Sequence, residues 1–187
     1  EPGKAADWSA QALEDLQIRA AEADFRLDKI EHVDASEAPH PAAMLQVPAD
    51  AKVMRIAWSR VRADGPIAYC AAHLAQDLAA RLPPDFADQL NTSRTIPLIE
   101  KHCNVRAFRV QQVSLAIAAD EALAHRLDVA PGAPLLLLQR TYFDIEGRPI
   151  YYSDLFVRSD RYLQKIELFR HRQNVALSRF SDEEDEA

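Results

Sequence analysis

Residues 127–138 read LDVAPGAPLLLL, and residues 45–56 read LQVPADAKVMRI. The two stretches align at an offset of 82 residues, and the same offset relates Gly65 to Gly147 and Tyr69 to Tyr151. In each copy a short helix leads into a turn, a long apolar strand, a tight turn and a return strand. Two copies are too few for a solenoid, but they can form two halves of one antiparallel sheet. The repeat therefore predicts an α+β fold in which helices flank a central antiparallel sheet with pseudo-two-fold symmetry.

The segments around the two copies complete the predicted architecture. Leu13, Leu16 and Ala20 recur at helical spacing after Ser9, which predicts an amphipathic helix over residues 9–23. The other predicted elements are strands over 25–33, 106–118 and 162–168 and helices over 41–45, 76–82 and 95–102, with Pro97 in the first turn of the last helix. We expect one folded domain over 25–168, an N-terminal helix and linker over 1–24, and a polar extension with an acidic tail over 169–187.

The charge of the chain argues against direct nucleic-acid binding. The formal net charge is -7, but five acidic residues stand at positions 182–186, and without those five the chain has 24 acidic and 22 basic residues. A nearly neutral domain offers no basic face to neutralise phosphates, which is the dominant contribution to DNA affinity.

Cysteine, glycine and hydropathy exclude further classes of protein. Cys70 and Cys103 are too few for a disulfide framework, no signal peptide begins the chain, and charged residues interrupt every apolar run, so we expect a cytoplasmic protein without a membrane span. Gly65, Gly132 and Gly147 each fall in an expected turn, which leaves no glycine-rich loop for a nucleotide. The six histidines lack metal-ligand spacing, so we expect no cofactor and no metal.

Several motifs resemble the UTRA domain, the effector-binding domain of HutC-type GntR transcriptional regulators. The second copy carries the likeness best, through the run 127–136, then Gln139-Arg140, then Gly147-Arg148-Pro149-Ile150 and the motif 158–162, RSDRY. The resemblance covers roughly 25–168 and implies a chorismate-lyase-like fold, a ligand pocket beside the sheet, and a homodimer. In the family a winged helix-turn-helix precedes this domain and reads DNA. This sequence does not contain one, so the chain is either a fragment that lacks that reader or a stand-alone copy of the domain.

Trp58, Arg60 and Arg62 alternate along one predicted strand, so we expect them on one face of it. A cation beside an aromatic ring can bind an anionic small molecule. The alternative interpretation is that this face of the sheet is exposed and that Trp58 belongs to the core. The resemblance favours the first interpretation, because family members often carry two arginines at positions 58 and 60. Trp58 departs from that pattern, which predicts a carboxylated or partly aromatic effector rather than a sugar phosphate.

The remaining predicted ligand-binding residues come from the middle helix and the return strands. The resemblance places Ser93 and Thr95 where the family offers a hydroxyl and backbone N–H groups to an anion, although a simple helix cap explains such residues equally well. Family members that bind amino sugars carry a glutamate on each return strand, at positions held here by Cys70 and Tyr151. Other residues of these strands that could line the pocket are Tyr69 and Ser153, although about half of such alternating residues should face the core.

Three functions remain open on the sequence. The first is a sensor in which a small molecule biases a dimeric DNA-binding protein. The second is an enzyme of the same fold that releases pyruvate from chorismate, and Arg60 and Arg62 suit that role too, although the expected acidic group is missing. The third is a dimerisation module without a ligand. Arg158 and Asp160 are expected to form a structural ion pair.

Overall fold

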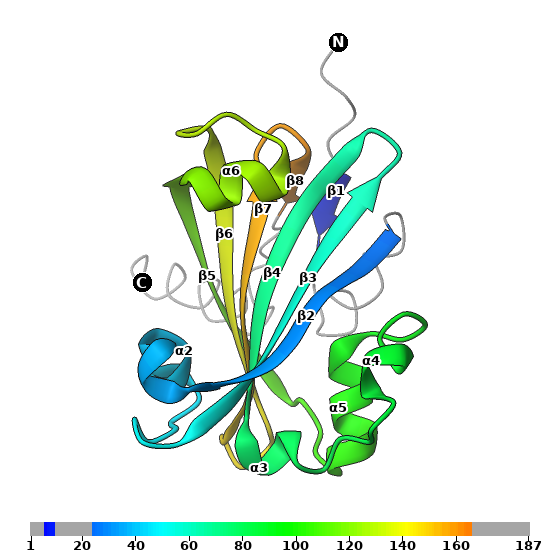
Figure 1. The fold of residues 1–187 in the computed structure, drawn as a ribbon, viewed down its shortest axis with the longest axis vertical. Helices are drawn as coiled ribbons and strands as arrows, with labels where there is room; N and C mark the ends of the chain where they lie inside the picture. The colour runs from blue at the N-terminus through cyan, green and yellow to red at the C-terminus, as the bar shows by residue number, and fades with distance from the viewer. Residues whose placement is uncertain (1–5, 10–23, 166–187) are drawn as a thin grey trace, which may run out of the picture.

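Six antiparallel strands form the central sheet of the computed structural model, which describes residues 6–9 and 24–165 (Figure 1). The strand order is β2-β3-β4-β7-β6-β5, and each strand pairs antiparallel with its neighbours. The strands are β2 (Asp24–Asp34), β3 (Lys52–Arg62), β4 (Gly65–Ala75), β5 (Arg109–Ala118), β6 (Pro134–Phe143) and β7 (Pro149–Arg158). The predicted fold class, α+β with a central antiparallel sheet, is confirmed.

The sequence repeat corresponds to the two halves of this sheet. Strands β2, β3 and β4 form one half, strands β5, β6 and β7 form the other, and the return strands β4 and β7 meet at the centre, where Ala71 pairs with Asp154. Helices α2 (Pro39–Met44) and α6 (Glu121–Leu127) precede the hairpins of their respective halves at the same offset of 82 residues.

The return strands, however, correspond at 83 residues rather than 82. Trp58 pairs with Cys70, while Arg140, which lies 82 positions after Trp58, pairs with Ser153, which lies 83 positions after Cys70. The counterpart of Tyr69 is therefore Tyr152, and the predicted correspondence with Tyr151 is wrong. A shift of one residue moves a side chain to the opposite face of a strand, so this correction decides on which face of the sheet Tyr151 and Tyr152 each lie.

Different helices cover the two faces of the sheet. Helices α3 (Gln76–Ala79), α4 (Phe86–Gln89) and α5 (Thr95–Cys103) bury Leu78, Phe86 and Ile99 in the largest apolar cluster. The sheet contributes Ile56, Cys70 and Leu138 to the same cluster, and we call this side the α5 face. Two smaller clusters pack α2 against Val53 and α6 against Leu135, on what we call the α6 face.

Local sequence explains where the helices begin and end. Pro97 lies in the first turn of α5, where its missing N–H breaks no helical hydrogen bond, and Asn104 ends that helix in the left-handed conformation with φ of 50°. The Asp120 carboxylate caps α6 by accepting a hydrogen bond from the Leu123 N–H at 2.7 Å. Gly132 has a φ of 82° in the turn before β6, a conformation that favours glycine.

A second, two-stranded sheet pairs β1 (Ala6–Ser9) in parallel with β8 (Tyr162–Lys165). The strand predicted over 162–168 thus begins where expected, but it does not extend the main sheet. The predicted helix over 9–23 lies outside the described residues, apart from Ser9 at the end of β1, and the predicted acidic tail lies outside them entirely. None of the helices in the described ranges is long and apolar enough to cross a membrane.

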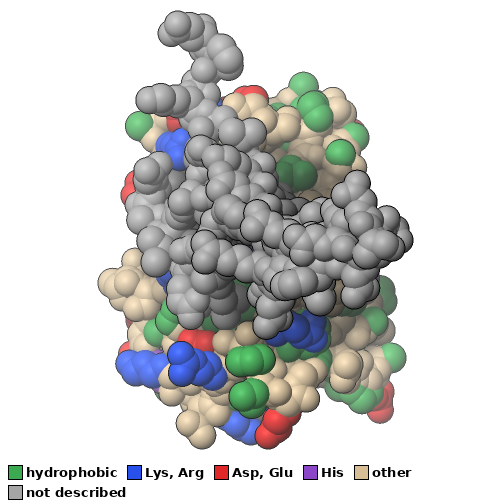
Figure 2. All heavy atoms as spheres, turned by 180° about the vertical axis from the view of Figure 1, so that it is seen from behind, with side chains coloured by type: hydrophobic (Ala, Val, Ile, Leu, Met, Phe, Trp, Pro, Cys, Tyr) green, Lys and Arg blue, Asp and Glu red, His purple; other side chains and the backbone are tan. Residues whose placement is uncertain are grey.

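On the reverse side of the molecule, charges of both signs are interspersed (Figure 2). In the lower part of this view, described basic side chains lie beside acidic and apolar ones. The view fits the near-neutral composition of the domain.

Candidate functional site

Six of the predicted ligand-binding residues lie together on the α5 face. Trp58 and Arg60 lie on β3 opposite Cys70 and Ala68 of β4, and Ser153 on β7 lies opposite Ala72. Side chains two residues apart share a face of a strand, which places Tyr151 beside Ser153. Helix α5 adds Thr95, because the Thr95 and Trp58 side chains lie near enough to the Tyr151 hydroxyl to affect its pKa. The cluster thus consists of Trp58, Arg60, Cys70, Thr95, Tyr151 and Ser153.

Arg60 lies against two aromatic rings in this cluster. Its guanidinium carbon is 5.3 Å from the centre of the Phe25 ring and 5.4 Å from that of Trp58, and these two rings are 5.6 Å apart. Burial lowers the pKa of Arg60, and the nearby Arg94 guanidinium lowers it further. Arginine stays charged nevertheless, so partial burial and a second cation concentrate positive charge at this point.

Arg140 is a member of the cluster that was not predicted from the sequence. It lies on β6 opposite Ser153, is 7% exposed, and donates from Nε to Oε1 of Gln112 at 2.7 Å. Its Nη2 is buried and has no hydrogen-bond partner within the described residues. A buried donor without a partner is costly, so the Nη2 atom of Arg140 is a candidate ligand contact. The repeat itself carried the missing signal, because Arg140 stands 82 positions after Trp58.

The cysteine and the tyrosine of the cluster are not activated. Burial raises the pKa of the Cys70 thiol far above its usual range, although Arg140 lowers it in part. Burial also raises the pKa of Tyr151 well above its usual range, and Cys70 and Tyr142 raise it further. Both groups are protonated at neutral pH, so they offer hydrogen bonds and contact area rather than a nucleophile or a base.

Thr95 and Ser93 differ in their surroundings. Thr95 is the first residue of α5 and is 8% exposed, whereas Ser93 is exposed in the preceding turn. The N-cap of α5 is Arg94, and no side chain forms a capping hydrogen bond there. The helix-cap interpretation therefore does not describe this helix, and Thr95 is the residue of the pair that reaches the cluster.

Tyr69, like Ser93, does not join the cluster, and Arg62 lies at the end of β3. Arg62 is the last residue of β3 and lies opposite Gly65, and the register shift between β3 and β4 leaves Ile67 of β4 as the extra residue, so the alternation of β3 itself is not interrupted. Tyr69 points to the α6 face, where it stacks on Phe156 with ring centres 6.1 Å apart.

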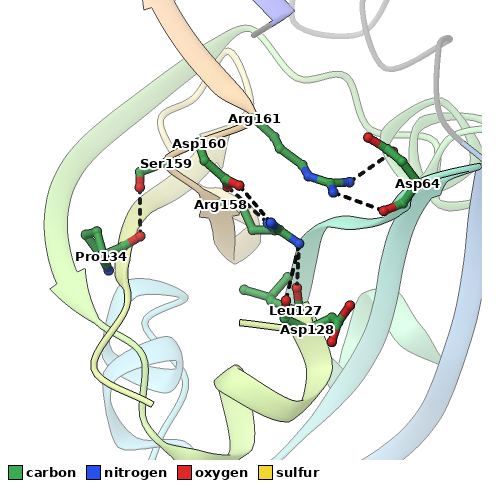
Figure 3. Close-up of polar contacts among 8 residues, drawn as sticks. All are labelled: Asp64, Leu127, Asp128, Pro134, Arg158, Ser159, Asp160 and Arg161. Atoms are coloured by element: carbon green, nitrogen blue, oxygen red, sulfur yellow. Dashed lines mark hydrogen bonds and ion pairs between the residues drawn. The ribbon is translucent and has the colours of Figure 1, made fainter. Parts of the chain in front are cut away.

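The motif 158–162 forms a clamp between separate parts of the fold (Figure 3). Arg158 donates to both carboxylate oxygens of Asp160 and to the backbone carbonyls of Leu127 and Asp128 at the end of α6. Arg161 binds the Asp64 carboxylate and carbonyl in the β3–β4 turn. The predicted structural ion pair of Arg158 and Asp160 is confirmed.

The family model of the UTRA domain matches residues 19–163, so the chain belongs to the UTRA domain family. The HTH-type transcriptional repressor NagR of Bacillus subtilis is 27% identical over 149 residues, which are 80% of this chain and 59% of NagR. The HTH-type transcriptional regulator Rv0792c of Mycobacterium tuberculosis is 27% identical over 107 residues, which are 57% of this chain and 40% of that protein. The chain therefore spans less than two thirds of these curated relatives.

Solved structures share the fold. A transcriptional regulator from Streptomyces coelicolor superposes with a TM-score of 0.67 at 28% identity, over 75% of this chain and 89% of that one. The ligand-binding domain of a GntR-family regulator from Bordetella bronchiseptica gives a TM-score of 0.68 at 23% identity, over 79% and 89% of the two chains. The similarity predicted from the motifs is confirmed.

Proposed function

We propose that this chain is the effector-binding domain of a cytoplasmic, homodimeric transcriptional regulator, and that its effector is an anionic small molecule bound on the α5 face. Binding changes the arrangement of two winged helix-turn-helix domains that are not part of this sequence. A ligand achieves this only if it binds one arrangement more tightly than the other. The family membership supports the sensing role, while the effector, its charge and the dimer are parts of the proposal.

The unpartnered Nη2 of Arg140 is the observation that carries the proposal. Arg140 and Arg60 both lower the pKa of the Cys70 thiol, which shows that the two guanidinium groups act on one small region. A carboxylate or phosphate group placed there would accept from Arg140 and would gain from the positive charge of Arg60. The rings of Phe25 and Trp58 beside Arg60 favour a ligand that also has an apolar or aromatic part.

A thermal-shift screen of small carboxylates and sugar phosphates, followed by isothermal titration, tests the proposal. A ligand at 100 times its Kd stabilises the folded state by about 2.7 kcal/mol, which corresponds to a rise in Tm of roughly 5–10 °C for a domain of this size. Arg140→Met should weaken the binding of the compound found by about 10-fold or more. A ligand whose affinity is unchanged in Arg140→Met would refute this site, and tight binding of a sugar phosphate would refute the preference for carboxylates.

The lyase alternative is tested by incubating the chain with chorismate and measuring 4-hydroxybenzoate. The protonated Cys70 and Tyr151 and the regulator relatives favour a sensor, so we expect no product. Product formation at an enzymatic rate would contradict the sensor proposal.

A further inference from the structure

A hollow lies on the α6 face, on the opposite side of the sheet from the proposed effector site. Its volume is about 590 Å³, which is within the range of small-molecule sites. Strands β2, β3 and β4 form its base, and residues of α2 and α6, the helices at either end of this face in Figure 1, form its rims. We call this hollow the groove.

The floor of the groove is made of two small side chains. Ala57 and Ala71 pair directly across β3 and β4, and larger side chains stand on either side of them along β4, namely Tyr69 and His73. Four residues along a strand span about 13 Å. The two methyl groups thus form a flat apolar patch between an aromatic ring and an imidazole, which suits a planar ligand.

One end of the groove carries a cation without an acidic partner. The guanidinium carbon of Arg126, in the last turn of α6, is 4.5 Å from the centre of the Tyr69 ring, and no ion pair joins Arg126 to a carboxylate in the described part of the chain. Tyr69 in turn stacks on Phe156, which holds the ring in place. An arginine stacked on a fixed ring is oriented to receive a carboxylate.

The other end carries a buried polar atom without a partner. His73 is 3% exposed, and its Nδ1 is buried with no hydrogen bond to any described residue. The Tyr152 ring, 6.3 Å away between ring centres, packs beside it, but the Tyr152 hydroxyl donates to Asp154 instead. Because buried polar atoms in folded proteins are almost always paired, a bound molecule with a hydroxyl or carbonyl would satisfy this one.

The acidic groups of the groove, by contrast, already have donors. Glu31 accepts from Nε and Nη2 of Arg55 and also pairs with Lys29, so one carboxylate serves two cations. Asp28 accepts from the Ser59 hydroxyl at 2.7 Å, and Glu37 accepts from the backbone N–H of Asp34. Each acidic group of the groove thus has a donor within the fold, whereas Arg126 has no carboxylate partner among the described residues and is the cation placed to receive an anion.

We propose that the groove is a second small-molecule site, separate from the effector site, and that it takes a planar organic anion such as an aromatic carboxylate. The ring lies on Ala57 and Ala71 between Tyr69 and His73, the carboxylate pairs with Arg126, and a polar substituent reaches His73. The groove adjoins the line where β4 meets β7, so its occupant contacts the first half of the sheet close to the junction with the second.

A titration of the ¹⁵N-labelled chain with 4-hydroxybenzoate, followed by two-dimensional NMR, tests the site. We expect saturable shifts at Tyr69, Ala71 and His73, at least 10-fold weaker binding in Arg126→Gln, and loss of the shifts in Ala71→Leu, whose side chain fills the floor. Arg106→Gln, which changes an exposed arginine away from the groove, is the matched control and should bind like the wild type. 4-Hydroxybenzyl alcohol, which has the ring without the carboxylate, should bind at least 10-fold more weakly.

Several results would overturn the inference. They are the absence of shifts at groove residues, equal binding of the alcohol, and unchanged binding in Arg126→Gln. Concentration-dependent broadening of the groove signals without ligand would instead assign the hollow to contact with a second copy. Shifts on the groove that persist in Arg140→Met would show that this site stands whether or not the α5 face binds an effector.

Discussion

The two halves of the sheet have the same backbone plan but different chemistry at matching positions. Ile56 and Leu138, related by the 82-residue offset, are both 0% exposed in the core of the α5 face. Beyond them, Trp58 and Arg60 in the first half correspond to Arg140 and Tyr142 in the second. The aromatic and the cation have thus exchanged places. The comparison teaches that the repeat preserves the apolar positions that hold the sheet together, while the neighbouring positions have diverged to surround one polar region from two sides.

The largest loss of stability is expected at the core positions that are apolar in both halves. Ile56→Ala and Leu138→Ala each leave a cavity in the shared core and should each lower the free energy of unfolding by about 2–5 kcal/mol. Urea unfolding measures both changes. A cost below 1 kcal/mol for one of the two variants would show that the halves do not contribute equally to one core.

The second-largest effect is expected in the pH dependence of stability, in which the two halves differ. His73 corresponds to Phe156 in the second half, and burial lowers the pKa of His73 to about 4. The unfolded chain binds the proton more readily, so the stability associated with neutral His73 is present above pH 6.5 and is lost as the pH falls towards 4.

His73→Phe, which makes the first half resemble the second, should therefore reduce the loss of stability between pH 7 and pH 5 by about 2 kcal/mol relative to the wild type. Urea unfolding at the two pH values measures this difference. An identical pH dependence in both proteins would show that the His73 imidazole is not held neutral.

Two arginines should respond in opposite directions to the same substitution. Arg158 is held by Asp160 and by the carbonyls at the end of α6, so Arg158→Met should destabilise the chain by about 1–2 kcal/mol. Arg140 is buried with an unpartnered donor, so Arg140→Met should leave the ligand-free chain equally stable or more stable by about 1 kcal/mol. Thermal unfolding without ligand compares them, and a larger loss in Arg140→Met would mean that Arg140 serves the fold.

The smallest effect is expected at the β3–β4 turn. Arg161 pairs with Asp64, whose side chain is 68% exposed, and ion pairs to exposed groups contribute little in water. Arg161→Gln should therefore cost less than about 1 kcal/mol, and the cost should fall at high salt. A loss as large as that of Arg158→Met would assign both arginines to one cooperative clamp.

Much of the fold could be predicted from the sequence because the relevant signals are local or repeated. Apolar stretches bounded by glycine and proline turns marked the strands from β2 to β7, and the duplication indicated how the hairpins combine. Helix α4 was not predicted, because it is a four-residue segment after Pro83 and Pro84 with no periodic pattern to detect. The candidate site was predicted in part: Trp58, Arg60, Cys70, Thr95, Tyr151 and Ser153 do lie together, whereas Ser93 and Tyr69 do not.

The sequence alone determined the strands, the turns, the duplication and the family to which the chain belongs, because each of these depends on the order and spacing of neighbouring residues. The tertiary structure decided which face each side chain occupies. Since strand side chains alternate, a one-residue difference between the return strands was enough to place Tyr151 on the α5 face while Tyr69 lies on the α6 face. Burial of Arg140 beside Cys70 was likewise decided by strand pairing, which brings together residues that are distant in the sequence.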